Sequence, residues 1–282
     1  MRTALTAIAD ELWRLKTAGV RTVAVSDDSL AALKAVVAKR SRPPARGKAL
    51  GAKAAGPAAA ARPAIALPPG DKAARWEALR SLVTDDPVCR SNVRAGKKVV
   101  LGVGNLDAQI MFIGEAPGAD EEVQGEPFVG PAGQLLNRMI AGMGIQRSDV
   151  YIGNIMNWRP QLPAGPDGVQ FGNRPPTPEE MAHCMPHLLA QIEIVRPAIL
   201  VALGATAAQG LLGSGTFKAL GEVRGQWREF SGRPLMVTYH PSYILRNPTN
   251  RSKRLIWEDL LKVMERAGLP ISEKQRSYFL GK

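Results

Sequence analysis

Cysteines and long apolar runs are scarce in this sequence of 282 residues. The two cysteines, Cys89 and Cys184, stand far apart and offer no disulfide framework. So few thiols are typical of a protein that works in a reducing compartment, and we expect a cytoplasmic protein. No run of about 18 apolar residues occurs, so the sequence predicts no membrane span and no membrane partner.

Acidic residues are fewer than basic ones, with 25 Asp and Glu against 37 Lys and Arg, which gives a net charge of +12. A basic protein of this kind favours a polyanionic partner such as nucleic acid. The excess is unevenly spread, because residues 39–70 carry seven basic residues and no acidic one. More than half of the net charge therefore lies in one short segment.

Composition divides the chain into three parts. Residues 1–38 carry short amphipathic patterns and acidic residues, which predict a small, partly ordered helical segment and make a poor secretory signal. Residues 39–71 are basic, rich in Ala and Pro and devoid of aromatics, which predicts a flexible linker. That linker either attracts phosphates or serves only as a tether. Residues 72–282 are expected to form the folded domain.

Apolar runs alternate with helical patterns in this domain. The runs suit buried strands at residues 109–113, 150–153, 198–203 and 235–239. Helical patterns occupy residues 133–143, 177–195, 205–212 and 255–267. Strands alternating with helices predict an α/β fold with three layers, α/β/α, around a mainly parallel, four-stranded sheet.

The residues that follow these strands are suited to a binding site. Glu115 follows the first strand and Phe128 lies a few residues later, Asn154 ends the second strand, and His240 follows the fourth. Ligands of parallel α/β sheets bind beyond the carboxyl ends of the strands. Each residue alone has an ordinary structural explanation, but together they suit a planar heterocycle: an aromatic face, an amide edge and an imidazole.

Three motifs now carry a family resemblance. They are Gly-Glu-Ala-Pro-Gly at 114–118 with Pro-Phe-Val-Gly-Pro-Ala-Gly-Gln-Leu-Leu at 127–136, Val-Tyr-Ile-Gly-Asn at 150–154, and His-Pro-Ser-Tyr-Ile-Leu-Arg at 240–246. Together and in this order they resemble the signatures of the family 4 uracil-DNA glycosylases, over roughly residues 80–265. The resemblance makes 72–282 the catalytic domain of a monofunctional, monomeric enzyme.

The resemblance implies hydrolysis of the N-glycosidic bond of deoxyuridine in DNA, with uracil-containing DNA as substrate and free uracil as product. The base must leave the duplex and enter a pocket. By carry-over, Phe128 stacks on uracil, Asn154 reads its edge, the backbone near Ala116 contacts it, and His240 stabilises the charge that grows on O2.

Two further groups take roles from the same resemblance. Glu115 and Glu121 would position water or stabilise the cationic sugar. A loop would enter the duplex, with Ile244 or Leu245 as an apolar wedge and Arg246 on a phosphate. The residues of that loop are Ser242, Tyr243, Ile244, Leu245 and Arg246.

The chain departs from the family at its iron–sulfur site. Family 4 enzymes usually hold a four-iron, four-sulfur cluster with four cysteines. Here only Cys89 and Cys184 remain, while Asp86 and Trp158 stand at the other two positions. We therefore predict no cluster and no other cofactor, with Trp158 filling the space. A metal at the helical trio His183, Cys184 and His187 is not favoured either, because no further spaced ligand follows.

A second departure is a Gly- and Pro-rich stretch at residues 161–173, longer than the usual family connection. Cross-linking relatives carry a histidine in an insertion here, and this stretch has none, which favours turnover. Two alternatives stay open from the sequence: a non-catalytic sensor of damaged or abasic DNA, and a glycosylase for another deaminated base.

Overall fold

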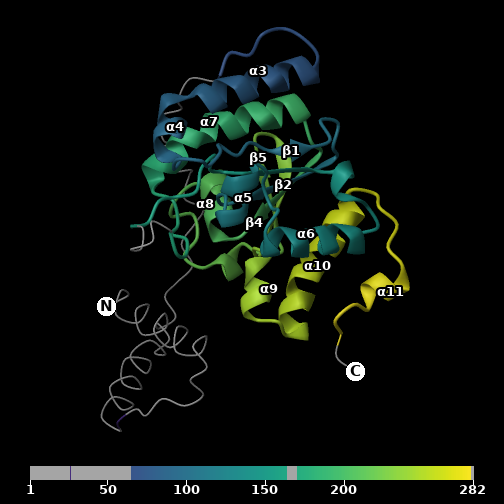
Figure 1. Ribbon diagram of the computed structural model, residues 1–282. Coiled ribbons are helices and arrows are strands. Elements are labelled where there is room, and N and C mark those ends of the chain that lie inside the picture. Colours follow the sequence, from purple (N-terminus) through teal and green to yellow (C-terminus); the bar gives the residue numbers. More distant parts are fainter. Residues whose placement is uncertain (1–25, 27–64, 164–169, 281–282) are drawn as a thin grey trace, which may run out of the picture. The chain divides into compact units, whose positions relative to one another are not determined.

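The computed structural model describes residues 26, 65–163 and 170–280 (Figure 1). The chain divides into two units, Met1–Gly56 and Pro57–Lys282, and nearly all described residues belong to the second. Most of the predicted N-terminal segment (1–38) and linker (39–71) lies outside the described residues, so these boundaries stay predictions. In the described part of the chain, no helix has the length and apolar character that crossing a membrane requires.

Six strands form one sheet in the order β1-β3-β2-β4-β6-β5. The four inner strands are mutually parallel and match the four strands that the sequence predicts. Their bounds are Ile110–Gly114 for β2, Tyr151–Asn154 for β3, Ile199–Leu203 for β4 and Arg233–Thr238 for β6. Every residue of β2, β3 and β4 is buried, as expected for parallel strands covered on both faces.

The sheet has two more strands than the four predicted. The antiparallel edge strands are β1 (Val103–Gly104), which pairs with β3, and β5 (Trp227–Phe230), which pairs with β6. Gly104 has a φ of 127° and lies against the backbone of Val150, so a side chain has no room there. The parallel core is as predicted, and the sheet is mixed only at its edges.

One face of the sheet is covered by α6 (Pro131–Gly142) and α10 (Asn250–Arg266). Phe112, Ile152 and Val201 point to this face and form one buried cluster with Leu136 of α6 and Leu260 of α10. The alternation along each strand sends their neighbours to the opposite face. A helix layer therefore packs on this side of the sheet, as the sequence predicts.

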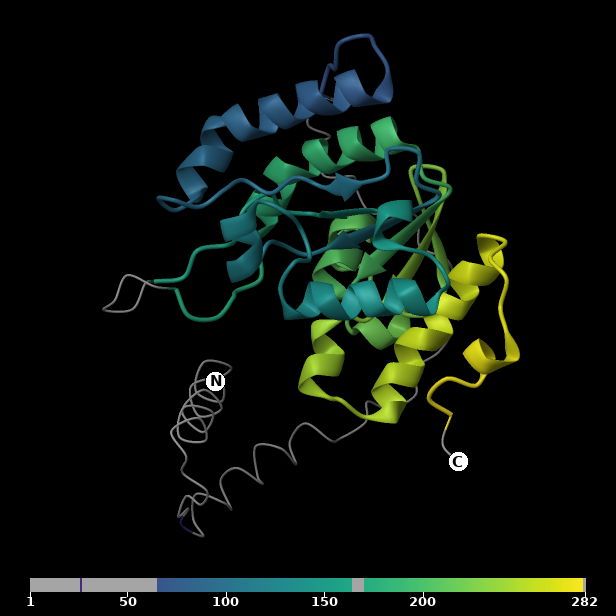
Figure 2. The ribbon, with the colours of Figure 1, turned by 45° about the vertical axis from the view of Figure 1, so that its right-hand side comes forward.

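The opposite face is covered by α7 (Pro178–Val195) and α8 (Ala205–Leu212), which bury Met111, Leu200 and Val237. Thr177 caps α7 by accepting the N–H of Glu180, which confirms the capping pattern read from the sequence. This completes the predicted α/β/α sandwich, and both views show it (Figures 1 and 2).

Two helices lie outside this sandwich and were not predicted. Helix α3 (Lys72–Asp85) lies along the outer side of α7, and α4 (Pro87–Asn92) follows it (Figures 1 and 2). A third buried cluster joins Leu79 and Val83 of α3 to Ala190 and Ile194 of α7. The remaining elements are short: α5 (Ala119–Gln124), α9 (Ser242–Arg246), α11 (Glu273–Arg276) and the 3-10 turns η1 (Arg147–Asp149) and η2 (Leu220–Glu222).

Candidate active site

A cavity of about 510 Å³ opens at the carboxyl edge of the parallel strands. Gly114 and Asn154 are register partners at the ends of β2 and β3, and Leu203 pairs with Thr238 at the ends of β4 and β6. The cavity is lined by residues from the turns that follow these strands. They include Glu115, Ala116, Glu121, Phe128, Asn154, Leu203, Gly204, Thr206, His240, Ser242, Leu245 and Arg246.

Phe128 lies in the connection between α5 and α6 and is 5% exposed. Its backbone has a φ of 56°, a strained conformation for an aromatic residue. Arg147 holds this conformation by donating to the carbonyls of Pro127, at 2.7 Å, and of Phe128, at 3.2 Å. A Cβ atom added to Gly114 would lie 2.5 Å from Cζ of Phe128, so the ring packs directly against the glycine backbone.

Asn154 has a buried polar atom that no described residue contacts by a hydrogen bond. The side chain is 5% exposed, and Oδ1 has no hydrogen-bond partner among the described residues. An unpartnered buried amide oxygen costs roughly 1–3 kcal/mol. A ligand that brings a donor into the cavity would recover that cost.

His240 is partly buried and lies beside Ser242. The backbone N–H of Ser242 donates to Nδ1 of His240 at 3.2 Å, and the Ser242 hydroxyl lies 2.8 Å from the same atom. Burial, helped by the charge of Arg246, lowers the pKa of His240 to about 4. At neutral pH the ring is therefore neutral, and because Nδ1 accepts from the backbone, Nε2 carries the proton and is a donor.

The two carboxylates predicted for catalysis have different surroundings. Burial raises the pKa of Glu115, and a hydrogen bond with Thr206 partly offsets that rise. Glu121 instead accepts hydrogen bonds from the backbone N–H groups of three residues: Gly118 at 3.0 Å, Val129 at 3.1 Å and Gly130 at 3.0 Å. Glu121 thus ties the turn after β2 to the turn that carries Phe128, and Glu115 is the freer of the two.

The segment predicted to enter DNA is the short helix α9 rather than a loop, which corrects the expectation. Ile244 is 7% exposed and belongs to the cluster under α6, whereas Leu245 is 45% exposed at the rim of the cavity. The ring of Tyr243 stacks on Tyr239 with 4.3 Å between centroids. Of the two candidate wedges, only Leu245 has an exposed side chain.

Arg246 and Ser242 complete this rim. Nη1 of Arg246 donates to the hydroxyl of Ser242 at 3.1 Å, and the Arg246 side chain is exposed. Because Ser242 also contacts His240, the exposed arginine is linked to the partly buried imidazole through a single residue.

Among the residues in or beside the cavity that were not predicted as site residues, Thr206, Arg147 and Asn173 make side-chain contacts there. Thr206 contacts Glu115, and the Gly-Ala-Thr turn after the third strand was its only sequence signal. Arg147 positions Phe128 from a distant 3-10 turn and carries no local signal. Asn173 lines the cavity and accepts from Nε of the buried Arg159 at 2.8 Å. Asn173 ends the 161–173 stretch, of which residues 164–169 lie outside the described residues.

Comparison with protein families decides the classification. The sequence model of the Uracil DNA glycosylase superfamily matches residues 101–261, more than half of the chain. The chain belongs to the uracil-DNA glycosylase superfamily. The matched residues contain the whole parallel sheet and the cavity.

Curated relatives refine the similarity. The chain is 46% identical over 165 residues to the Type-4 uracil-DNA glycosylase of Thermotoga maritima, covering 58% of this chain and 80% of that protein. It is 42% identical over 160 residues to the protein of the same name from Archaeoglobus fulgidus, covering 55% and 75%. A DNA polymerase of Bacillus phage SP01 matches 54% of this chain at 30% identity, over 15% of its own length. The fold and the family 4 resemblance predicted from the motifs are confirmed.

The residues at the expected iron–sulfur site do not fit a four-iron, four-sulfur cluster. Such a cluster takes four thiolates, and the chain has only Cys89 and Cys184. Both thiols are buried and close enough to interact, since a hydrogen bond to Cys184, together with burial, raises the pKa of Cys89. Trp158, 1% exposed, lies in the same buried cluster. The tryptophan ring occupies volume there and offers no ligand atom.

Proposed function

We propose that this chain is a uracil-DNA glycosylase that acts in DNA repair, as its superfamily and its Type-4 relatives indicate. The reaction breaks the bond between N1 of uracil and C1′ of the sugar. The electron pair leaves with the base, water adds to C1′, and an abasic site and free uracil are the products. Because a base stacked inside a duplex cannot reach the cavity, the base must be flipped out of the helix.

The unpartnered amide oxygen of Asn154 is the observation that carries this proposal. N3–H of uracil is a donor and O4 is an acceptor, so an asparagine amide matches that edge with both of its groups. The ring of Phe128 supports the base from one face, with the backbone near Ala116 beside it.

In this proposal, His240 stabilises the negative charge that develops on the departing uracil. Cleavage places negative charge on O2 of the uracil, and a neutral imidazole with its proton on Nε2 donates a hydrogen bond to it. The depressed pKa of His240 supports this role, because the ring stays neutral and needs no proton from solvent. Stabilisation then grows with the charge itself, which lowers the barrier rather than only tightening binding.

Glu115 is our choice for the carboxylate that positions water or stabilises the cationic sugar. It lines the cavity and is free of the backbone bonds that occupy Glu121. We assign Glu121 to holding the turns around Phe128. Leu245 would fill the space that the flipped base leaves in the helix, and Arg246 would contact a phosphate, with Ser242 and Tyr243 supporting the rim.

The wider expectations belong to the same proposal. The enzyme is monofunctional and monomeric, uses no iron–sulfur cluster, and acts on the DNA of the nucleoid in the cytoplasm. The two-cysteine count and the packed Trp158 support the absence of the cluster. The basic segment of residues 39–70 would add a salt-sensitive attraction to DNA outside the catalytic domain.

Excision from a labelled oligonucleotide bearing a single uracil, followed by alkali to cleave abasic sites, tests the proposal. Uracil-dependent cleavage is the expected result, with an otherwise identical thymine oligonucleotide as the control. Binding without cleavage would make the protein a sensor of damaged DNA. Cleavage only at hypoxanthine or xanthine would reassign the base that Asn154 reads.

A further inference from the structure

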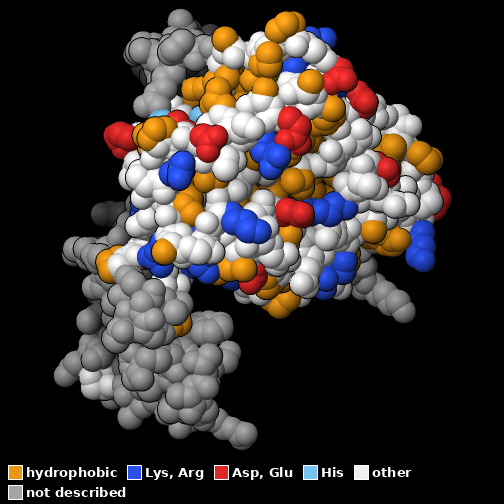
Figure 3. Space-filling view, turned by 45° about the horizontal axis from the view of Figure 1, so that its top comes forward, with side chains coloured by type: hydrophobic (Ala, Val, Ile, Leu, Met, Phe, Trp, Pro, Cys, Tyr) orange, Lys and Arg blue, Asp and Glu red, His pale blue; other side chains and the backbone are white. Residues whose placement is uncertain are grey.

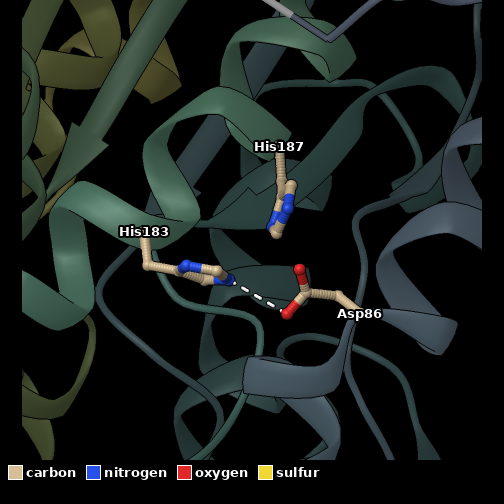
Figure 4. A group of neighbouring side chains, drawn as sticks. All are labelled: Asp86, His183 and His187. Carbon is tan, nitrogen blue, oxygen red and sulfur yellow. Dashed lines mark hydrogen bonds and ion pairs between the residues drawn. The ribbon is translucent and has the colours of Figure 1, made fainter. Parts of the chain in front are cut away.

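Asp86, His183 and His187 form a cluster of possible metal ligands, none of which lines the cavity described above (Figure 4). One ligand atom from each lies within 4.8 Å of the others, and Nε2 of His183 is 3.0 Å from Oδ1 of Asp86. Figure 4 shows the two histidines of α7 pointing toward Asp86, which precedes α4. Side chains from two segments far apart in sequence, the start of α4 and the helix α7, therefore lie next to one another.

The geometry of this cluster suits one small divalent ion. Zinc takes nitrogen and oxygen ligands at about 2.0–2.2 Å and is typically tetrahedral, which places neighbouring ligand atoms about 3.3 Å apart. The distance of 3.0 Å between His183 and Asp86 is close to that value, and the other ligand atoms lie within 4.8 Å of one another. His183 and His187 are one helical turn apart, so they share a face of α7.

The surroundings orient the ligands as a metal site requires. The Nδ2 group of Asn157 donates to the carbonyl of Val100 at 3.1 Å, so Oδ1 of Asn157 faces Nδ1 of His187 as an acceptor, at 2.8 Å. His187 therefore donates from Nδ1, and the lone pair of its neutral ring is on Nε2. Asp86 is fixed by the N–H of Cys89, which donates to its carboxylate at 2.7 Å. Such outer hydrogen bonds usually set the tautomer and direction of metal ligands.

Burial and access also fit an ion. His187 is 4% exposed, while the side chains of Asp86 and His183 keep 19% and 17% of their surface. Figure 3, which brings the top of Figure 1 forward, shows a small histidine surface in pale blue among acidic and apolar side chains. The partial exposure of Asp86 and His183 gives an ion access to the cluster in the described part of the chain, and water can complete its coordination.

We propose that Asp86, His183 and His187 bind a single zinc ion that joins α4 to α7, beside Cys89 and Cys184. The ion would stabilise the corner where relatives of the family hold their cluster, with nitrogen and oxygen ligands in place of four thiolates. Asp86 stands where the family has a cluster cysteine, and its carboxylate would supply an oxygen ligand to zinc in place of that thiolate. The two thiols remain outside the ligand set.

Metal analysis of the purified full-length chain is the first test. We expect one zinc per chain, and a chelator should remove it and lower the melting temperature. After chelation, calorimetric titration with zinc should show one site, and zinc should restore the melting temperature. Iron with acid-labile sulfide, or no zinc binding by the chelated chain, would overturn the proposal.

Variants identify the ligands. His183→Ala and His187→Ala should each abolish binding of stoichiometric zinc, and Asn157→Ala should weaken it about 10- to 100-fold through the loss of orientation. His240→Ala is the matched control, because it removes the third histidine of the chain and should leave one zinc bound. A double Cys89→Ser, Cys184→Ser variant should also keep the zinc.

Cobalt substitution tests the ligand set without a variant. Cobalt in the chelated wild-type chain should show tetrahedral visible bands and lack thiolate-to-cobalt charge transfer. A thiolate band, or zinc lost only in the cysteine variant, would contradict the proposed ligands. All these measurements are made without DNA, so they can contradict the zinc site without contradicting the glycosylase assignment, and the reverse is also true.

Discussion

The rings of Phe128 and His240 lie 5.5 Å apart between centroids, with their planes inclined by 33°. Phe128 comes from the turn before α6, and His240 follows β6, so the sheet edge brings together two segments distant in sequence. A base stacked on Phe128 would present its edge toward the imidazole. The chemistry proposed for this cavity therefore depends on how His240 is held.

The pH dependence of excision should report on His240. Its pKa of about 4 means that the neutral ring persists well below pH 6.5, so protonation of His240 should lower the rate only as the pH approaches 4, below the acid loss due to Glu115, whose pKa is raised by burial. Arg246→Ala removes a charge that lowers this pKa, so the acid limb should move to higher pH. Single-turnover rates at saturating enzyme separate this shift from weaker DNA binding, and Arg246→Lys should keep the wild-type profile.

The same pKa has a consequence for stability. Between pH 6.5 and about 4, His240 binds a proton in the unfolded chain but not in the folded chain. This group therefore lowers the free energy of unfolding as the pH falls through that range. Urea denaturation of wild type and His240→Gln at pH 7 and pH 5 measures how the free energy of unfolding changes with pH. An equal pH dependence in both proteins would contradict a folded state in which the His240 ring is neutral.

Asn154→Ala should separate function from folding. The amide oxygen has no partner among the described residues, so the fold loses little, and its melting temperature should stay within a few degrees of wild type. If Asn154 reads the base as proposed, two hydrogen bonds at roughly 1–3 kcal/mol each would be lost, so excision should fall by about 100-fold or more. Single-turnover rates and thermal denaturation check both halves, and a stable variant with normal excision would remove Asn154 from the pocket assignment.

Much of the fold follows from the sequence because its core strands are continuous apolar runs. Residues 110–114 and 199–203 are buried throughout, and such runs indicate parallel strands with helices on both sides. The edge strands carry no such signal: β1 has two residues, and β5 mixes apolar and charged side chains at intermediate or exposed positions. Their pairing depends on neighbours that are distant in sequence.

Some residues of the candidate site can also be predicted from the sequence, and others cannot. Asn154 and His240 are predictable because they end or follow strands, where α/β folds bind ligands. The backbone bonds of Glu121 depend on how two turns meet, and the sequence shows only a carboxylate. The contact of Asp86 with His183 spans 97 positions, so the sequence shows Asp86 only as a residue at a cysteine position. The spacing of His183, Cys184 and His187 within one helix gives no sign of this third side chain.

Glu115 and Glu121 should respond differently to substitution. Glu115→Gln keeps the shape and removes the charge from the cavity, so excision should fall by about 100- to 1,000-fold with little change in stability. Glu121→Ala leaves three backbone N–H groups without their acceptor and should destabilise the fold by roughly 2–4 kcal/mol. Urea denaturation beside single-turnover rates distinguishes them, and a fully stable Glu121→Ala variant would contradict the structural role.

Ile244 and Leu245 are adjacent and chemically similar, which makes them matched variants. Ile244→Ala empties part of the core and should cost about 2–5 kcal/mol of stability. Leu245→Ala alters an exposed side chain and should change stability by about 0.5 kcal/mol or less. If Leu245 fills the gap in the duplex, its removal should slow excision from double-stranded DNA more than from single strands. Equal slowing on both substrates would argue against a wedge.

The buried Asp259 and the partly buried Arg224 form an ion pair behind β6, which ends at Thr238, two residues before His240. Nη1 of Arg224 lies 2.8 and 2.9 Å from the two carboxylate oxygens, and Thr238 donates to Asp259 at 2.6 Å. Burial raises the pKa of Asp259 to about 6, so the folded state favours its proton and loses stability from this group as the pH rises through 6.

Arg224→Ala should leave that carboxylate buried and unpaired, at a cost of about 3–5 kcal/mol at pH 7. At pH 5 Asp259 is largely protonated, so the loss should be clearly smaller. Urea denaturation at both pH values measures the difference, with the exposed Arg228→Ala as control, for which about 0.5 kcal/mol or less is expected. Adding Asp259→Asn to Arg224→Ala should recover much of the stability at pH 7, because the neutral amide needs no counter-charge. A loss that is equal at both pH values would mean that packing, rather than charge, explains the pair.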